Sequence, residues 1–452
     1  MGIAKRQTTT RDMTQGNIAI QILLFALPLM LGNVFQMLYN TVDSIVVGQY
    51  VGTEALAAIG ATTMITNMAV FFFNGFSVGA GVIIGRYFGA KNEKQLHKAV
   101  ETTMAATFIF CILFTIIGVK GVRFMLDFMD TPEDVIAPAG TYLRIYFLGI
   151  SGLLIYNMGS GILRAVGDTT RPLYFLILTS IMNIVLDLVL VLNAGLGIAG
   201  VAIATIISQF ISAILILVLL MGTKDIYKLT LPDLRIDFLI LRDIFAVGLP
   251  AGIQSVITAF SNVFVQSYIN HFQSAVMAGW GCYNKIDQFI MLPIGSFAMA
   301  STTFVSQNIG AGNQKRATLG TKISVGMAVL INFVIAVLLF VFADFSVRLF
   351  TSDPEVIRAG AVFLHVNTFF LLFNTVNHVL AGALRGHGDS RAPMIIMLIG
   401  FVAIRQTYLY LITHYVINVP WVVGFGYPVG WTATCIMETL YFYYRWNHPK
   451  TV

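Results

Sequence analysis

Charged residues are scarce in this chain of 452 residues. Asp, Glu, Lys and Arg make up 11% of the sequence and hydrophobic residues make up 57%, whereas roughly 25% of residues in an ordinary soluble domain are charged. A soluble fold could not bury so much apolar surface. The composition therefore excludes a secreted domain, a nucleic-acid-binding module and a cytosolic enzyme. The net charge of +6 is interpreted as a sign of membrane topology.

Cysteines and catalytic motifs are also scarce. Cys111, Cys282 and Cys435 each lie within an apolar segment without a CxxC spacing, which is typical of small core residues. The sequence has no GxxxxGK[ST] pattern, no HExxH pattern and no nucleophile motif. These absences disfavour ATP-driven transport and membrane hydrolysis, so we expect no enzymatic activity.

Apolar runs of membrane-spanning length recur from residue 18 almost to the C-terminus. A transmembrane helix needs about 20 mostly apolar residues, and polar clusters, glycine and proline separate these runs. The first run is too long for a signal peptide and has no small-residue cleavage site. The pattern predicts an all-α integral membrane protein with twelve transmembrane helices, at 18–47, 55–84, 96–119, 136–161, 171–192, 195–221, 239–269, 275–304, 318–343, 356–383, 392–416 and 420–446.

The distribution of Lys and Arg supports this count, because basic residues concentrate in cytoplasmic loops. The two tails and the even-numbered loops carry 20 of the 27 basic residues, and the odd-numbered loops carry 4. The other three, Arg144, Lys285 and Arg405, fall within predicted helices. We therefore expect both termini to be cytoplasmic.

The two halves of the sequence repeat at an offset of 220 to 222 residues. Four pairs of strings align in order: ALP with GLP from residues 26 and 248, GAKNEK with GAGNQK from 89 and 310, TPEDVI with DPEVI from 131 and 353, and LRAVGDTTRP with LRGHGDSRAP from 163 and 384. Six helices per half is an even number, so an axis along the membrane normal should relate the halves. The predicted domains are a cytoplasmic tail, an N-terminal six-helix bundle, a cytoplasmic linker, a C-terminal six-helix bundle and a second tail, at 1–17, 18–221, 222–238, 239–446 and 447–452.

Parallel repeats of this kind place two bundles around a central cavity, which is the plan of a secondary transporter and not of a channel. Further strings in the first half are NTVDSIVVGQYVG at 40–52, NIVLDLVLV at 183–191 and GIAGVAIATIISQ at 197–209. In this order, and with the duplicated loops, the chain resembles the MATE (multidrug and toxic compound extrusion) transporters over nearly its whole length. The resemblance implies export of cationic or amphipathic organic compounds in exchange for H⁺ or Na⁺.

Asp43 and Asp187 are the only acids well inside the predicted helices of the first half. An ionisable side chain inside a bilayer costs about 2.5 to 3.5 kcal/mol on insertion scales, so each acid is a functional candidate. Asn183 lies four residues before Asp187 and shares its helical face, and Thr205 and Tyr142 are expected at a similar depth. These oxygens suit a hard cation or a proton held on a buried acid. Alternatively, the side chains only brace helix packing.

The resemblance implies a cation site in the N-terminal bundle, which would be a Na⁺ site in a sodium-coupled protein, formed by Asp43, Asn183, Asp187 and Thr205. The repeat offset takes the two acids to Val265 and Tyr408, so the second half has lost both carboxylates. We therefore expect coupling through the N-terminal bundle alone, with no cofactor other than H⁺ or Na⁺ as the coupling ion.

Two polar stripes at helical spacing are predicted to line the substrate cavity. They consist of Asn33, Gln36 and Asn40 on the first helix and Gln254, Thr258 and Asn262 on the seventh. The alternative is hydrogen bonding between helices within each bundle. Four further charges lie within helices of the second half, namely Lys285, Asp287, Arg405 and Glu438. They either neutralise one another in a structural network, or Asp287 or Glu438 faces the cavity and attracts a cationic substrate.

Together with these features, the resemblance to the MATE transporters implies a cation-coupled multidrug antiporter in a bacterial plasma membrane. We expect a monomer in contact with membrane lipid, small organic cations or amphipathic drugs as substrates, and no nucleic-acid partner. The alternative is an exporter of one dedicated metabolite, or a flippase for a lipid-linked precursor, which should expose a strongly basic cavity. An ion channel or a receptor would need a filter sequence or a sensory domain, and the sequence contains neither.

Overall fold

The computed structural model describes residues 10–129 and 131–447, apart from the side chains at positions 53, 54, 56, 57, 64, 68 and 134. The secondary structure of this part of the chain is helical and includes no strand. Residues 1–9 of the predicted N-terminal tail and residues 448–452 of the C-terminal tail lie outside the described residues.

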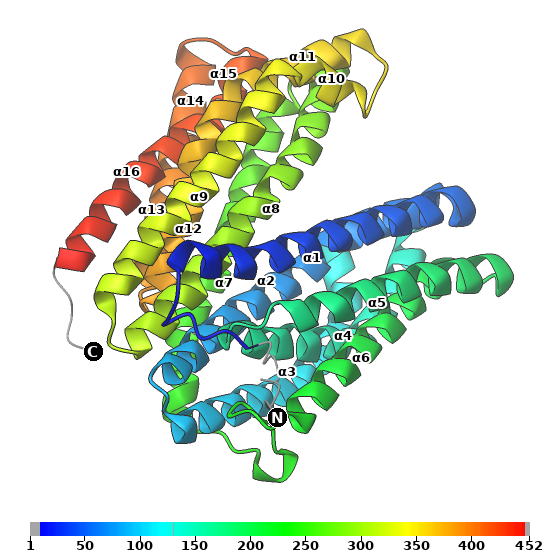
Figure 1. The fold of residues 1–452 in the computed structure, drawn as a ribbon. Coiled ribbons are helices and arrows are strands. Elements are labelled where there is room, and N and C mark those ends of the chain that lie inside the picture. The colour runs from blue at the N-terminus through cyan, green and yellow to red at the C-terminus, as the bar shows by residue number, and fades with distance from the viewer. Residues whose placement is uncertain (1–9, 130, 448–452) are drawn as a thin grey trace, which may run out of the picture. The chain divides into compact units, whose positions relative to one another are not determined.

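Six long helices form the first half of the chain (Figure 1). Their bounds, with two short π-helical continuations, are α1 (Ile18–Val46), η1 (Val47–Val51), α2 (Thr53–Gly89), α3 (Glu93–Phe128), α4 (Glu133–Ala165), α5 (Thr170–Leu188), η2 (Val189–Asn193) and α6 (Gly197–Gly222). The linker that follows contains the 3₁₀ helix η3 (Leu231–Asp233).

The second half contains more helical elements because three of its predicted helices, 356–383, 392–416 and 420–446, are divided into shorter elements and because a short helix follows α9. Its elements are α7 (Phe238–Ile269), α8 (Ser274–Gly310), α9 (Gln314–Val341), α10 (Ala343–Arg348), α11 (Pro354–Asn367), η4 (Thr368–Phe370), α12 (Leu371–Gly386), α13 (Arg391–Met397), η5 (Leu398–Ile404), α14 (Arg405–Tyr415), α15 (Pro420–Gly424) and α16 (Gly426–Asn447). The chain continues from α11 through η4 into α12, and from α13 through η5 into α14, so each predicted helix persists as one helical path.

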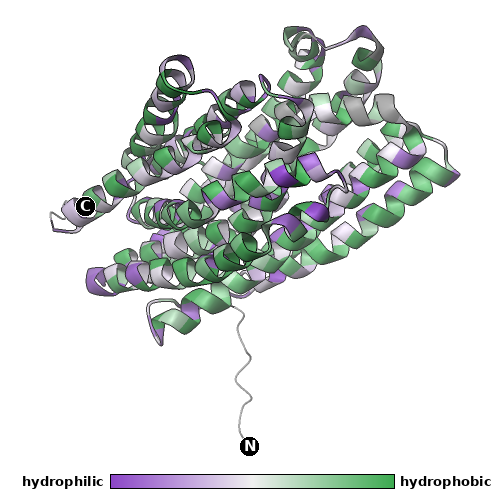
Figure 2. Cartoon of the chain, turned by 90° about the horizontal axis from the view of Figure 1, so that it is seen from above, coloured by the Kyte–Doolittle hydropathy of each residue, from purple (hydrophilic) through white to green (hydrophobic). Residues whose placement is uncertain are grey.

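Eleven helical stretches in the described part of the chain are long and apolar enough to cross a membrane. The twelfth predicted span, 420–446, corresponds to α15 and α16, and α16 has 22 residues. Figure 2 shows hydrophobic residues along most of the helices and hydrophilic residues frequently at their connections. The predicted all-α membrane fold is therefore confirmed.

The chain divides into two compact units at boundaries that differ from the predicted bundles. Among the described residues, one unit contains 10–12, 27–129 and 131–248, and the other contains 13–26 and 249–447. Both α1 and α7 therefore begin in one unit and continue in the other. Each boundary lies just before a proline inside the helix, Pro28 in α1 and Pro250 in α7. Proline interrupts the helical hydrogen-bond ladder and is a common cause of kinks.

Close packing explains why the start of α7 belongs to the first unit. A Cβ atom on Gly79 of α2 would lie 2.8 Å from the backbone N of Gly248. Only glycine allows helices α2 and α7 to approach so closely. The segment Met13–Gly16 is held in the second unit by a different kind of contact, because Arg316 of α9 donates hydrogen bonds to the carbonyl oxygens of Met13, Gln15 and Gly16.

The repeated loop strings adopt the same backbone conformations in both halves. Lys91 and Gly312, 221 residues apart, both have positive φ, of 53° and 72°. Gly167 and Gly388 share a φ of 85° at the same offset. These angles lie in the left-handed region that favours glycine. The repeated loops are therefore turns of one kind, used twice.

The linker between the two halves is folded against α3. The side chain of Tyr227 is 0% exposed, its hydroxyl donates a hydrogen bond to Asp225 Oδ2 at 3.0 Å, and burial raises the pKa of Tyr227. Further along, Thr102 of α3 donates to the carbonyl oxygen of Arg235 at 3.3 Å and accepts from the backbone N of Asp237 at 3.0 Å.

Candidate cation site

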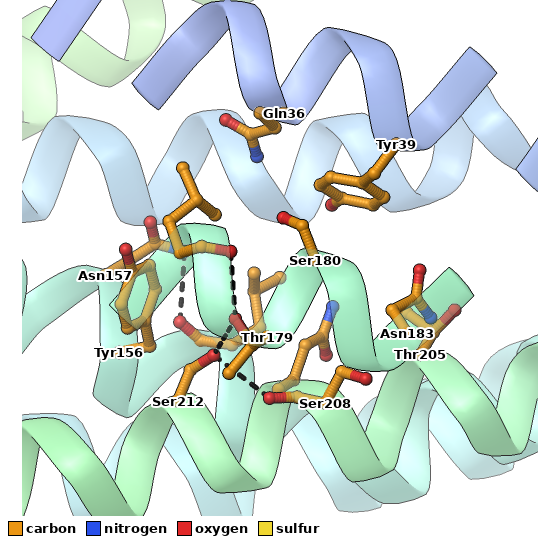
Figure 3. A pocket seen from close by; sticks show the side chains of 13 residues that line it. Gln36, Tyr39, Tyr156, Asn157, Thr179, Ser180, Asn183, Thr205, Ser208 and Ser212 are labelled. Carbon is orange, nitrogen blue, oxygen red and sulfur yellow. Dashed lines mark hydrogen bonds between the residues drawn. The ribbon is translucent and has the colours of Figure 1, made fainter. Parts of the chain in front are cut away.

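Four helices of the first unit, α1, α4, α5 and α6, surround a polar pocket (Figure 3). Leu153 and Leu176 are its only apolar lining residues among those described. The polar lining residues are Gln36, Tyr39, Tyr156, Asn157, Thr179, Ser180, Asn183, Thr205, Ser208, Gln209 and Ser212. A pocket with so many donors and acceptors at bilayer depth is suited to a hydrated or ionic occupant and not to packing alone.

One face of α5 carries buried polar groups that lack partners. Ser180, Asn183 and Asp187 are spaced three and four residues apart, so they share this face, and they are 6%, 3% and 0% exposed. The hydroxyl of Ser180, the side-chain amide of Asn183 and both carboxylate oxygens of Asp187 have no hydrogen-bond partner among the described residues. Leaving such groups unsatisfied costs about 1 to 3 kcal/mol each. The arrangement therefore points to an occupant that comes from outside the chain.

Three helices bring acidic and phenolic groups together beside this face. The carboxyl groups of Asp43 on α1 and Asp187 on α5 are near enough to interact with each other. The phenol of Tyr142 on α4 interacts with both acids, and Tyr39, one turn before Asp43, interacts with Asp43. Asp43 Oδ1 is buried and has no hydrogen-bond partner. Residues that are far apart in the sequence thus meet at one place.

Helix α6 contributes a stripe of hydroxyl groups. The hydroxyl of Thr205 donates to the carbonyl oxygen of Val201 at 3.0 Å, and that of Ser212 lies 2.9 Å from Thr179 Oγ1. Because Thr205 uses its proton within its own helix, its oxygen can still accept a hydrogen bond or coordinate a cation. Ser208 lies between them in the stripe, is 6% exposed, and its hydroxyl has no partner.

An apolar cluster lies one helical turn beyond the acids along the chain. Val46 and Val47 follow Asp43, and Val191 follows Asp187 within η2. Together with Ala55 and Val201 they form one buried cluster. Two of its members lie in the π-helical turns η1 and η2, an irregularity that is frequent at functional sites.

The predicted cavity residues occupy different environments. Asn33 is half-buried and Asn40 is exposed, while Gln36 is exposed and lines the pocket of the first unit. In the second unit Gln254 is only 5% exposed. Its side-chain oxygen accepts a hydrogen bond at 3.1 Å from Arg385 of α12. Gln254 therefore bonds to another helix of its own unit, which is the alternative given above to a place in the substrate cavity.

The other two predicted residues on α7 also make local hydrogen bonds. Thr258 donates to the carbonyl oxygen of Gln254 at 2.9 Å. Asn262 Oδ1 accepts a hydrogen bond from Arg405 at 3.1 Å. These contacts lie within the second unit, and they leave Asn262 itself exposed.

The four charged residues predicted to lie in the membrane in the second half do not form ion pairs with one another in the described part of the chain. They are Lys285, Asp287, Arg405 and Glu438. Lys285 is exposed and its ammonium lies 5.7 Å from the centre of the Phe350 ring. The guanidinium of Arg405 is 1% exposed and donates to Phe401 O at 2.9 Å and to Ser261. Arg405 therefore donates its hydrogen bonds to neutral oxygens, and the ion-pair network among these four residues is absent from the described part of the chain.

Glu438 and Asp287, the two acids among these four residues, have separate surroundings. Glu438 on α16 is 0% exposed and interacts electrostatically with Arg385 of α12. Asp287 on α8 has a buried oxygen without a hydrogen-bond partner and lies near the phenols of Tyr283 and Tyr427. The charged partner of Glu438 is thus Arg385, which belongs to the repeated string LRGHGDSRAP. It is neither Lys285 nor Arg405, the two basic residues that we counted within the predicted helices of the second half.

Several pocket residues were not singled out from the sequence. Ser180 lies three residues before Asn183, Ser208 lies three after Thr205, and Tyr39 lies four before Asp43. Helical spacing from the predicted site residues would have found all three. No comparable signal marks Tyr156 of α4, which lines the pocket and donates a hydrogen bond to Pro172 O at 3.1 Å.

Comparison with known proteins identifies the family. The MatE family model matches residues 28–189 and matches again at residues 250–411. The chain belongs to the MATE transporter family. The two matches begin 222 residues apart, which confirms the internal repeat. The members of this family are transporters and not enzymes.

Curated relatives match over the whole length of the MATE chain. "Probable multidrug resistance protein YpnP" of Bacillus subtilis is 31% identical over 97% of this chain and 98% of the relative. "Probable multidrug resistance protein YoeA" of the same organism is 27% identical over 100% of this chain and 99% of the relative. A solved structure of a multidrug resistance MATE family transporter in an outward-facing conformation has a TM-score of 0.92 at 24% identity, covering 99% of this chain and 100% of that one.

Proposed function

We propose that this MATE protein is a secondary active antiporter that exports cationic or amphipathic organic compounds in exchange for H⁺ or Na⁺. The observation that carries the proposal is the pair Asp43 and Asp187, in which Asp43 Oδ1 and both carboxylate oxygens of Asp187 are buried and lack hydrogen-bond partners beside the unsatisfied amide of Asn183. The names of the curated relatives support organic drugs as the substrate class.

Burial makes the acid pair responsive to a cation. Two ionised carboxylates that interact at low dielectric repel each other, so one charge is removed by protonation or is neutralised by a bound cation. A proton on either acid, or Na⁺ held by Asp43, Asp187, Asn183 and Thr205, would satisfy the orphaned oxygens. Both occupants carry a positive charge, so a gradient of H⁺ or Na⁺ can change the net charge of the site by loading or unloading one cation.

Alternating access would couple this change to transport. We propose that loading and unloading of the cation biases the chain between conformations that open the substrate cavity to opposite sides. When the substrate is neutral, one cation entering through 100 mV supplies about 2.3 kcal/mol, which sustains a substrate gradient of roughly 40-fold at about 1.4 kcal/mol per factor of ten. Exchange of one monovalent cation for a singly charged substrate moves no net charge, so the concentration gradient of the coupling cation then drives export.

The location, topology and oligomeric state of the protein are also part of this proposal. We propose a plasma-membrane location with both termini cytoplasmic, because basic residues concentrate in the tails and the even-numbered loops. We further propose that the protein works as a monomer in the lipid bilayer, and that the coupling cation is the one ion it needs.

The test is efflux of a fluorescent organic cation from proteoliposomes under a pH gradient and, separately, a Na⁺ gradient. Asp43→Asn and Asp187→Asn keep the side-chain shape and should each abolish gradient-driven efflux. Asp127→Asn is the control, since this acid is half-exposed on α3 and pairs with Arg123. Size-exclusion profiles establish that each variant is folded. Near-wild-type efflux by both site variants would overturn the site assignment. Dye that moves under neither gradient in the wild type would overturn the multidrug substrate class.

A further inference from the structure

A second group of ligand-type side chains lies away from the transport site, where the linker meets α3. A ring nitrogen of His97, a carboxylate oxygen of Glu101 and a carboxylate oxygen of Asp233 all lie within 4.8 Å of one another. His97 and Glu101 are four residues apart on α3 and therefore share a face. The short 3₁₀ helix η3 ends at Asp233 and brings its carboxylate to that face.

The three side chains differ in exposure. Glu101 is only 7% exposed, and its Oε1 lies 2.8 Å from His97 Nε2. His97 is half-buried, and Asp233 is exposed at the open side. Thr230 Oγ1 lies 3.1 Å from His97 Nε2. One face of the group is thus closed by protein and the other is accessible to an ion from solution.

The charges of the group are unequal. Two carboxylates oppose one imidazole, so the group is net negative whether or not His97 is protonated. The nearby basic residues do not fully cancel this charge: Lys98 pairs with Asp237 at 3.8 Å, and Arg235 of the linker interacts with Glu101 at longer range. A buried carboxylate next to a second acid favours a cation.

The supporting contacts hold the linker in place at this point of α3. Thr102, the residue after Glu101, bonds the linker backbone at Arg235 and Asp237. Orientation of ligand-bearing segments by neighbouring hydrogen bonds is typical of metal sites.

We propose that His97, Glu101 and Asp233 form a binding site for a divalent transition-metal ion, with Zn²⁺ as its first candidate. Imidazole nitrogen and carboxylate oxygen are both ligands that Zn²⁺ takes, and three protein ligands leave the fourth position open for water. A tetrahedral ion needs its donor atoms about 3.3 Å from one another, so His97 and Glu101, at 2.8 Å, have to separate slightly, and exposed Asp233 has to approach by changing rotamer. The imidazole favours Zn²⁺ or Co²⁺ over Mg²⁺ and Ca²⁺.

Metal binding here would tie the linker to the first unit. The site joins α3 to the segment that connects the two repeats, so the bound ion stabilises the linker against local opening. Trypsin sites at Lys228 and Arg235 flank Asp233 and are exposed, which makes linker opening measurable.

The test uses the purified full-length chain after removal of any histidine tag, which would itself bind the metal. Co²⁺ is titrated and followed by visible absorption, and Zn²⁺ is added to displace it. We expect one Co²⁺ per chain, with binding weakened about tenfold or more in His97→Gln and in Asp233→Asn. Asp243→Asn, which removes an exposed acid of α7, should bind as the wild type does.

Proteolysis gives a second readout that does not depend on absorption. Zn²⁺ should slow tryptic cleavage within the linker in the wild type and in Asp243→Asn, and should have no effect in His97→Gln or Asp233→Asn. The proposal is overturned if the wild type takes up no Co²⁺ at micromolar concentrations, or if both site variants bind it as tightly as the wild type. The readouts are independent of transport, so neither result depends on the antiport proposal.

Discussion

The close approach of α4 and α6 gives a sharp test of the structure around the pocket. A Cβ atom on Gly152 of α4 would lie 2.8 Å from the backbone N of Phe210 and 2.9 Å from the carbonyl carbon of Gln209. These are backbone atoms, which cannot rotate away as a side chain can. Gly152→Ala should therefore force the two helices apart by several tenths of an ångström.

The magnitude follows from two opposing terms. Overpacking of a tight contact costs about 1 to 3 kcal/mol, whereas Gly→Ala in a helix gains about 1 kcal/mol. Gly60→Ala in α2 is the matched control, since a Cβ atom there meets nothing within 4 Å. The helix term is common to both variants, so the difference between them is the packing cost. We expect Gly152→Ala to be less stable than Gly60→Ala by about 2 kcal/mol, or roughly 30-fold in the unfolding equilibrium.

The assay is reversible unfolding in mixed micelles, followed by circular dichroism, for the wild type and both variants under identical conditions. The expected order of stability is Gly60→Ala, then wild type, then Gly152→Ala. Equal stability of the two variants would refute the close α4–α6 contact, because the same methyl group would then have cost nothing at a position that the structure shows as blocked.

Two further predictions concern the second unit. Arg405→Leu should lower the stability of the fold by about 2 to 4 kcal/mol, because it orphans buried oxygens, including that of Ser261; chemical unfolding measures this, and an unchanged midpoint would contradict the buried hydrogen-bond network. Asp287→Asn should weaken export of an organic cation about tenfold, which is about 1.4 kcal/mol, while export of a neutral compound changes little. Parallel flux assays with the two substrates test this, and equal losses would show that the carboxylate of Asp287 does not act on charge.

Much of the fold could be predicted because its determinants are local in the sequence. Apolar runs define the helices, and the duplicated loops fix the repeat, since Gly167 and Gly388 need the same left-handed backbone. The candidate site was accessible for a related reason. Asp187 and Asn183 share a helical face by spacing alone, and an intramembrane carboxylate such as Asp43 is costly enough to draw attention.

Other features depend on tertiary contacts that no pattern in one sequence reveals. Glu438 interacts with Arg385, a residue 53 positions earlier in the repeated string LRGHGDSRAP, so counting charges within helices gave the wrong set of partners. The unit boundaries beside Pro28 and Pro250 differ from the predicted bundle limits because single helices continue from one unit into the other. The contact between Asp233 and His97 requires the folded linker.

The most direct measurement of the central claim is the movement of the counter-cation itself. Proteoliposomes are loaded with an organic cation substrate, no ion gradient is imposed, and internal H⁺ and Na⁺ are followed as the substrate leaves. The account predicts that one of these ions enters in step with substrate efflux, and that Asp43→Asn and Asp187→Asn abolish both movements together. Substrate efflux without entry of either ion would contradict antiport.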